Sequence, residues 1–336
     1  PNRYLSKRLT IKQSLCKIAS LLRDFKDKRY PKEVRAATMK HLLRRLIILT
    51  ADKLENTSKL LRGAADKVIP EKRIFLLDLE KSGWKTVRPC FVLSTGRCGT
   101  LLLNELLLLS PNADPNHEPK PELYRPSKRA YEEIDRFPEV FHEVFKSARE
   151  EYLLKAAKQD KIYIETNNQS TFFAPIIPAV FPNAIFIHLV RHPGSFVRSG
   201  IRRRWYTEGH SHDIGRIVPK DPSTIQKWTN YSLIEKNGWL WNETNQFILD
   251  FLTKIPMDKQ LFVKAEDLFL QPEITRKIYD FIGLEGFEIK SVKRLLKHPV
   301  NQQLKGEFPT YKNWSELEKS SLMHVAPLAQ KFGYAM

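Results

Sequence analysis

The sequence predicts an α/β fold in which helices flank a parallel β-sheet, with a basic helical segment preceding it. From residue 87 onward, short apolar runs typical of buried strands alternate with segments of helical spacing. Strands separated by helices pair in parallel through right-handed crossovers and carry helices on both faces. The 336 residues suffice to bury the core of one large α/β domain. We therefore expect a helical N-terminal segment over residues 1–86 and an α/β domain over residues 87–336.

The N-terminal segment carries most of the formal net charge of +18. Residues 1–88 contain 23 Lys and Arg against 9 Asp and Glu, a net charge of +14. Their apolar residues recur at three- and four-residue spacing with Lys and Arg between them, which predicts amphipathic helices. One interpretation is a helical pair with a solvated basic face, and the alternative is a surface that binds an anionic membrane or an acidic acceptor. We expect no nucleic acid as a partner, because no recognisable binding motif accompanies the charge.

The elements of the second segment follow one another in a regular order. The sequence predicts strands over residues 88–94, 161–166, 184–191 and 260–268, and helices over residues 99–110, 193–206 and 272–284. The uncharged run over residues 166–190 contains three prolines, so it predicts a strand end, a loop, a helix and the next strand rather than a membrane span. Because ligands of such sheets bind at the carboxyl ends of the strands, the loop after the first strand is expected at a binding site.

That loop has the composition of an anion-binding turn. Two glycines allow a close approach of the main chain to a ligand, the following helix contributes its N-terminal N–H groups, and an arginine adds a full charge. The residues expected to bind the anion are Thr95, Gly96, Arg97, Cys98, Gly99 and Thr100. The GxxxxGK[ST] pattern of nucleoside triphosphatases is absent. On its own, the loop is equally consistent with a tight connection between a strand and a helix.

A second element decides between these interpretations. Arg191 ends a predicted strand, and Ser199 follows it by eight residues, about two turns into the next helix. Both side chains can therefore bind one further phosphate group. The three arginines after Ser199, residues 202–204, face different directions in a helix, so not all of them can reach one ligand.

These motifs resemble those of sulfotransferases that use 3′-phosphoadenosine 5′-phosphosulfate (PAPS). In that family a [K/R]-S-G-T loop holds the 5′-phosphosulfate, and an R-x-P-x5-S motif holds the 3′-phosphate. This chain is similar in its Arg97-Cys98-Gly99-Thr100 stretch, in Arg191, Pro193 and Ser199, and in the segments "VKAEDLFLQPEITRKIYDFIGL" and "WSELEKSSLMHVAPLAQKFGYAM". The resemblance covers residues 88–336 and implies a P-loop-like fold, PAPS as co-substrate and no metal. Cys98 departs from the usual serine, and "IETNNQS" lacks the lysine that many members carry after the second strand.

The resemblance also implies roles for further residues. Arg97 is the candidate for stabilising the leaving group, and Glu118 is the candidate base, with His117 as the alternative. Lys305 and Gly306 stand where many members close a loop over the 3′-phosphate. The implied reaction is sulfuryl transfer to a hydroxyl or amine of a carbohydrate, a glycolipid or another small alcohol. A nucleotide-dependent kinase and a non-catalytic nucleotide-binding protein are the alternatives.

The compartment is predicted from cysteines and glycosylation motifs. Three cysteines cannot form a disulfide framework, which favours a reducing compartment. Five N-x-[ST] motifs, at Asn56, Asn168, Asn230, Asn242 and Asn313, are instead typical of a secretory protein. Because Asn168 lies beside a predicted active-site strand, we favour a cytoplasmic enzyme, for which peripheral attachment to a membrane through the basic segment is one option. The alternative is a Golgi-lumenal enzyme without its N-terminal anchor. The sequence does not specify an oligomeric state.

Overall fold

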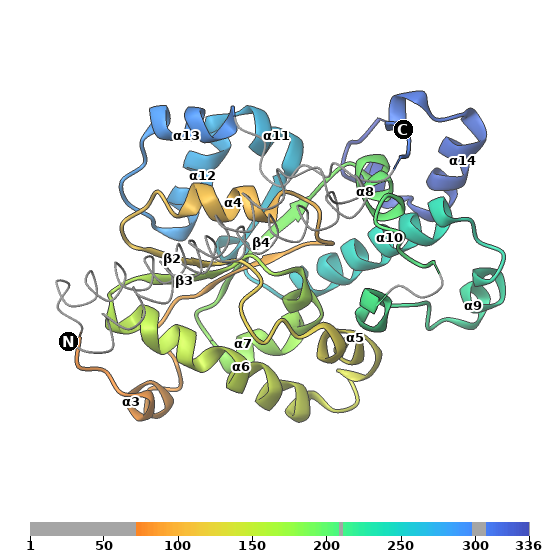
Figure 1. The fold of residues 1–336 in the computed structure, drawn as a ribbon. Coiled ribbons are helices and arrows are strands. Elements are labelled where there is room, and N and C mark those ends of the chain that lie inside the picture. The colour runs from red at the N-terminus through yellow and green to blue at the C-terminus, as the bar shows by residue number, and fades with distance from the viewer. Residues whose placement is uncertain (1–71, 208–210, 298–306, 336) are drawn as a thin grey trace, which may run out of the picture. The chain divides into compact units, whose positions relative to one another are not determined.

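Five short strands form a parallel sheet in the computed structural model (Figure 1), which describes residues 72–207, 211–297 and 307–335. The strands lie side by side in the order β2-β3-β1-β4-β5, and every neighbouring pair is parallel. Their bounds are β1 Cys90–Leu93, β2 Ala113–Asn116, β3 Ile162–Glu165, β4 Ile185–Val190 and β5 Gln260–Lys264. The predicted α/β fold is confirmed.

Helical layers cover both faces of the sheet (Figure 1). In β1, Cys90 and Val92 belong to the hydrophobic cluster on one face, whereas Phe91 and Leu93 belong to the cluster on the other. The first face is covered by α4 Thr100–Leu107, α12 Pro272–Ile282 and α13 Ile289–Leu296. The second face is covered by α6 Pro138–Lys158, α7 Ile177–Val180 and α10 Leu233–Leu252. Since both faces are buried, the central strands are apolar along their whole length.

The remaining elements connect these layers or cover their ends. The helices are α3 Leu76–Lys81, α5 Tyr124–Glu133, α8 Pro193–Ile201, α9 Pro222–Trp228, α11 Ala265–Leu270, α14 Glu316–Val325 and α15 Leu328–Lys331. The 3₁₀ turns are η1 Asn168–Ile176, η2 Ser211–Gly215, η3 Met257–Lys259 and η4 Tyr311–Asn313. None of the helices in the described part of the chain is both long and apolar enough to cross a bilayer.

The sequence prediction named no helix where α5, α6, α9 and α10 lie, and three further elements differ from it. Strand β2 was not predicted, because its sequence "ADPN" consists largely of residues that are rare in strands; an edge strand tolerates its proline. The strand predicted over residues 260–268 ends at Lys264, since its partner β4 ends opposite at Val190, and α11 begins there. The helix predicted over residues 193–206 ends at Ile201, and the chain continues in turns.

The predicted N-terminal segment lies for the most part outside the described residues. Its last part, residues 72–86, is described and contains α3. Leu79 and Trp84 of this part are buried in the hydrophobic cluster on the α6 face, where the Trp84 ring meets the Phe181 ring edge-to-face with centroids 5.3 Å apart. All described residues belong to the compact unit Glu71–Met336.

Candidate active site

The loop between β1 and α4 is built on left-handed backbone. Gly96, Arg97 and Gly99 have φ angles of 74°, 56° and 87°. The two glycines adopt this conformation without cost, whereas Arg97 adopts it with some strain. Gly99 is the N-cap of α4, so the unpaired N–H groups of the first helical turn point back into the loop. The loop therefore has the left-handed turn and the helix N-terminus that its predicted anion-binding role requires.

Neighbouring elements enclose both glycines. A Cβ atom on Gly96 would lie 3.0 Å from the Cγ atom of Asn168 in η1. A Cβ atom on Gly99 would lie 2.4 Å from the Cε1 atom of Phe269 in α11. The β1–α4 loop is thus held between two elements that the sequence alone did not connect with it.

The small polar side chains of the loop form hydrogen bonds within the loop and so stabilise its conformation. Thr95 Oγ1 and Cys98 Sγ each donate to the carbonyl of Gly96 at 3.1 Å. Burial raises the pKa of the Cys98 thiol to about 11, so the thiol stays protonated and remains a donor. The Ser94 N–H donates to Thr171 Oγ1 at 3.1 Å, and the Thr171 hydroxyl donates back to the Ser94 carbonyl at 3.0 Å. Thr95 and Cys98 can offer an anion their backbone N–H groups, while their side chains are used within the loop.

Arg191 follows β4 and contacts the loop directly. Its Nη1 donates to the Arg97 carbonyl at 2.9 Å, and its guanidinium lies over the Phe269 ring at 5.6 Å. Its own carbonyl accepts from Trp241 Nε1 of α10 at 2.8 Å. Arg191 Nε is buried and has no hydrogen-bond partner among the described residues. A buried N–H donor without a partner is costly, and a bound anion would supply the missing acceptor.

Ser199 lies between two guanidinium groups. Arg97 Nε donates to Ser199 Oγ at 3.4 Å, and Arg203 Nη1 donates to the same oxygen at 3.2 Å. Burial and the nearby Arg191 lower the pKa of Arg97, so cations are crowded at this point. The fold thus brings together three of the predicted site residues, Arg97, Arg191 and Ser199.

His117 and Glu118 directly follow β2, so they lie at the carboxyl ends of the strands, as the β1–α4 loop does. His117 Nδ1 is 2.9 Å from the Thr166 carbonyl oxygen and 3.1 Å from Thr166 Oγ1. Because a carbonyl oxygen only accepts, Nδ1 carries the proton, and Nε2 is the basic nitrogen of the neutral ring. Glu118 is exposed. Burial and Arg191 lower the pKa of Arg97, whereas the negative charge of Glu118 raises it. The Glu118 carboxylate therefore lies within electrostatic reach of the Arg97 guanidinium.

Strand β3 ends at a buried carboxylate, that of Glu165, and no lysine directly follows it. Glu165 is fully buried and accepts from Arg149 Nε at 2.7 Å and from Arg149 Nη2 at 2.9 Å. Tyr163, Asn167 and Ser170 also donate to its carboxylate. The Arg149 charge is thus satisfied by Glu165 inside the protein. These contacts anchor the turn from β3 into η1, which carries the Asn168 side chain to Gly96.

Two further residues support the site and were not predicted from the sequence. Glu266 of α11 accepts from the His192 N–H at 3.0 Å and from the Tyr334 hydroxyl at 3.0 Å, which ties the start of α8 to the C-terminal segment. Phe269 fills the space between Gly99 and Arg191. Both belong to the segment "VKAEDLFLQP", which was recognised in the sequence without a role for either side chain.

Lys305 and Gly306 lie outside the described residues, so their predicted role stays a prediction. Within the described ranges, no group of three or more His, Cys, Asp or Glu residues is placed to hold a metal ion.

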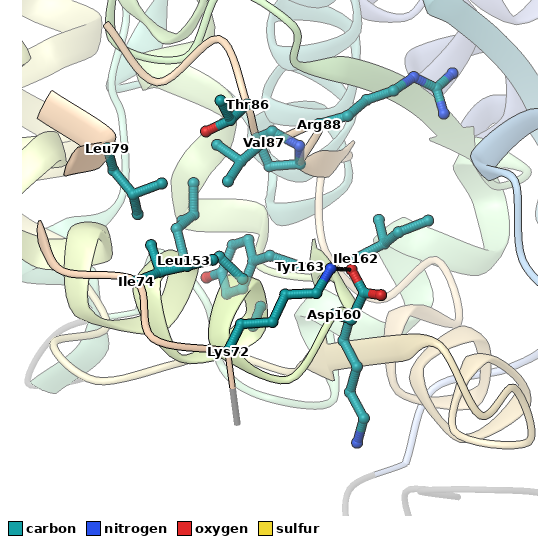
Figure 2. Close-up of a pocket in the computed structure, with 14 residues that line it drawn as sticks. Lys72, Ile74, Leu79, Thr86, Val87, Arg88, Leu153, Asp160, Ile162 and Tyr163 are labelled. Carbon is teal, nitrogen blue, oxygen red and sulfur yellow. Dashed lines mark hydrogen bonds and ion pairs between the residues drawn. The ribbon is translucent and has the colours of Figure 1, made fainter. Parts of the chain in front are cut away.

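A cavity of about 410 Å³ lies at the opposite, amino-terminal end of the strands (Figure 2). Leu79, Val87 and Leu153 line it with apolar side chains, and Lys72 pairs with Asp160 at 2.6 Å. Because the loop after β1 is at the other end of the sheet, this cavity is separate from the candidate site.

Comparison with known proteins gives a match to a family and to solved structures. Residues 89–288 match the model described as "Sulfotransferase family". The fold is similar to the sulfotransferase domain from the curacin biosynthetic pathway, with 18% identity and a TM-score of 0.44 over 75% of this chain and 99% of that one. It is also similar to the sulfotransferase STF1 from Mycobacterium tuberculosis H37Rv, with 15% identity and a TM-score of 0.42 over 73% and 81% of the two chains. The curated proteins contain no significant match.

Proposed function

Because the chain belongs to the sulfotransferase family, we propose that it transfers the sulfuryl group of PAPS to a hydroxyl or amine of an acceptor. We propose a carbohydrate, a glycolipid or another small alcohol as that acceptor. The observation that carries the proposal is the convergence of Arg97, Arg191 and Ser199, which come from the β1–α4 loop, the end of β4 and α8. This convergence provides donors for two anionic groups of one nucleotide.

The donors in the site fit such a nucleotide. The N–H groups at the start of α4 face the loop, and Arg191 Nε is buried without a partner in the part of the chain that the structure describes. Ser199 Oγ accepts from Arg97 and Arg203, so both of its lone pairs are used and its own proton points elsewhere. No described residue accepts that proton. Ser199 can therefore donate to a phosphate oxygen while two guanidinium groups flank the contact.

PAPS supplies a sulfuryl group attached to a good leaving group. In the transfer, the acceptor oxygen or nitrogen forms a bond to sulfur, the bond from sulfur to the bridging oxygen breaks, and the acceptor proton moves to a base. Arg97 and the N-terminal N–H groups of α4 stabilise the charge that grows on the bridging oxygen. Arg191 and Ser199 hold the 3′-phosphate and so position the nucleotide.

We assign the base to Glu118, with His117 as the alternative. The Glu118 carboxylate is exposed to an incoming acceptor and lies within electrostatic reach of Arg97. His117 is held through Nδ1 by Thr166, so only its Nε2 atom could accept the proton. Both residues directly follow β2, so either would lie at the carboxyl ends of the strands, where the β1–α4 loop would bind its anion.

The proposal also covers the chemical class of the acceptor and the cellular compartment of the enzyme. The net charge of +18 suits an acidic glycan or glycolipid and an anionic membrane surface. Two of the five glycosylation motifs have asparagines with structural roles: Asn168 lies against Gly96, and Asn242 Oδ1 accepts from the Leu328 N–H at 3.1 Å. A glycan on Asn168 would displace the loop, which supports a cytoplasmic enzyme over a secretory one.

Radiolabelled PAPS incubated with a panel of sugars, glycolipids and simple alcohols tests the proposal. We expect transfer of label to at least one acceptor class, and weaker transfer by Arg97→Ala. Calorimetry with 3′-phosphoadenosine 5′-phosphate and with ATP tests the choice of nucleotide. Tighter, magnesium-dependent binding of ATP would favour a kinase, and nucleotide binding without transfer to any acceptor would favour a non-catalytic protein.

A further inference from the structure

Arg203 contacts the candidate site although it lies beyond the helix that carries Ser199. Helix α8 ends at Ile201, and the Arg203 N–H donates to the Gly200 carbonyl at 3.0 Å in the turn that follows. This turn directs Arg203 Nη1 to Ser199 Oγ at 3.2 Å. The neighbouring Arg204 is exposed. Because the chain leaves the helix after Ile201, the turn brings the Arg203 guanidinium to Ser199.

Arg203 is partly buried beside other arginines. Burial and the positive charges of Arg97 and Arg202 lower its pKa to about 10. Arg97 and Arg203 approach Ser199 Oγ from different elements of the chain. An anion bound at Ser199 would therefore lie between the positive charges of Arg97 and Arg203, which favours its binding.

We propose that Arg203 binds the same phosphate group as Ser199, through N–H donation from its guanidinium to terminal phosphate oxygens. The proposal rests on the proposed function, in which this group is the 3′-phosphate of the nucleotide. A phosphate has three terminal oxygens, and Ser199, Arg191 and Arg203 reach it from a helix, a strand end and a turn. Fork-shaped donation from arginine to phosphate is both strong and directional. Arg203 thereby favours nucleotides with a 3′-phosphate over those without one.

The test compares Arg203→Gln with Arg204→Gln in the full chain. Arg204 is the matched control, because its replacement removes the same charge from an exposed position one residue away. Calorimetry measures the affinity for 3′-phosphoadenosine 5′-phosphate and, separately, for adenosine 5′-monophosphate, which lacks the 3′-phosphate. We expect Arg203→Gln to weaken binding of the first nucleotide by about tenfold or more and that of the second by less than about twofold. Arg204→Gln should change neither by more than about twofold.

Three results would overturn the inference. Equal losses in the two variants would show an effect of net charge alone. Equal losses of Arg203→Gln for the two nucleotides would place its contact away from the 3′-phosphate. Unchanged affinity together with a lower melting temperature of the free protein would make Arg203 a structural residue. The proposed function fails separately, if the wild-type chain binds neither nucleotide.

Discussion

Replacing Gly99 by alanine perturbs the β1–α4 loop at its most crowded point. The φ angle of Gly99 is +87°, and an added Cβ would lie 2.4 Å from Phe269 Cε1 and 2.8 Å from Phe269 Cζ. The Phe269 ring cannot move away freely, because the Arg191 guanidinium lies over it at 5.6 Å. We therefore expect Gly99→Ala both to destabilise the protein and to weaken nucleotide binding.

Two contributions determine the size of the loss. Left-handed backbone costs an alanine about 1–2 kcal/mol relative to glycine. Forcing an extra methyl group into a well-packed place costs about 1–3 kcal/mol. The free energy of unfolding should therefore fall by about 2–5 kcal/mol. Affinity for 3′-phosphoadenosine 5′-phosphate should also fall, since a displaced loop turns the N–H groups of α4 away from the anion.

Gly83 provides the control that separates the two contributions. Its φ angle is +59°, and no atom of the described residues lies within 4 Å of an added Cβ. Gly83→Ala should therefore cost only the backbone contribution of about 1–2 kcal/mol and leave nucleotide binding unchanged. Urea denaturation followed by tryptophan fluorescence measures both variants. Combining Gly99→Ala with Phe269→Leu should recover part of the steric loss. If Gly99→Ala is no less stable than Gly83→Ala and binds nucleotide like the wild type, the reasoning about Phe269 is refuted.

Three further predictions concern the nucleotide, the base and acid stability. Arg191→Ala should weaken binding of 3′-phosphoadenosine 5′-phosphate by about tenfold or more in calorimetry, and Ser199→Ala should weaken it less, because only the first removes a charged donor. Glu118→Gln should lower turnover by roughly 10²–10⁴ at nearly unchanged nucleotide affinity, whereas His117→Gln should be mild. Burial lowers the pKa of His188 from 6.5 to about 4, so the unfolded chain takes up this proton first as the pH falls. The His188 contribution to the free energy of unfolding is present above pH 6.5 and is lost between pH 6.5 and about 4, by about 3 kcal/mol in total. Urea denaturation at pH 7 and at pH 4.5 measures this loss. The loss between the two pH values should be smaller in His188→Gln than in the wild type.

Each of these predictions has an outcome that contradicts it. Unchanged affinity of both the Arg191 and Ser199 variants would remove these residues from the site. A larger loss of turnover in His117→Gln than in Glu118→Gln would transfer the role of base to His117, provided that the chemical step limits the rate. Equal loss of stability between pH 7 and pH 4.5 in the wild type and His188→Gln would show that His188 does not titrate as its burial implies.

Local patterns sufficed to predict much of the fold and to name three residues that the fold brings together in the candidate site. Strand and helix periods are properties of neighbouring residues, so the alternation after residue 87 predicted the parallel sheet. Glycine is the residue that reaches left-handed backbone without cost, so Gly96 and Gly99 predicted the turn. The short spacing from Arg191 to Ser199 likewise placed one side chain at a strand end and the other about two turns into the next helix. In each case, the information lies within about ten residues of the chain.

Contacts between distant segments decided the rest. Strand β2 exists because its backbone pairs with β3, although "ADPN" is a poor strand sequence. Phe269 and Glu266 support the site because α11 begins where β4 no longer offers a partner to β5. Arg203 reaches Ser199 because α8 ends early in a turn. Sequence periodicity does not predict contacts between distant segments. Such hydrogen bonds and packing depend on where the completed sheet places each side chain.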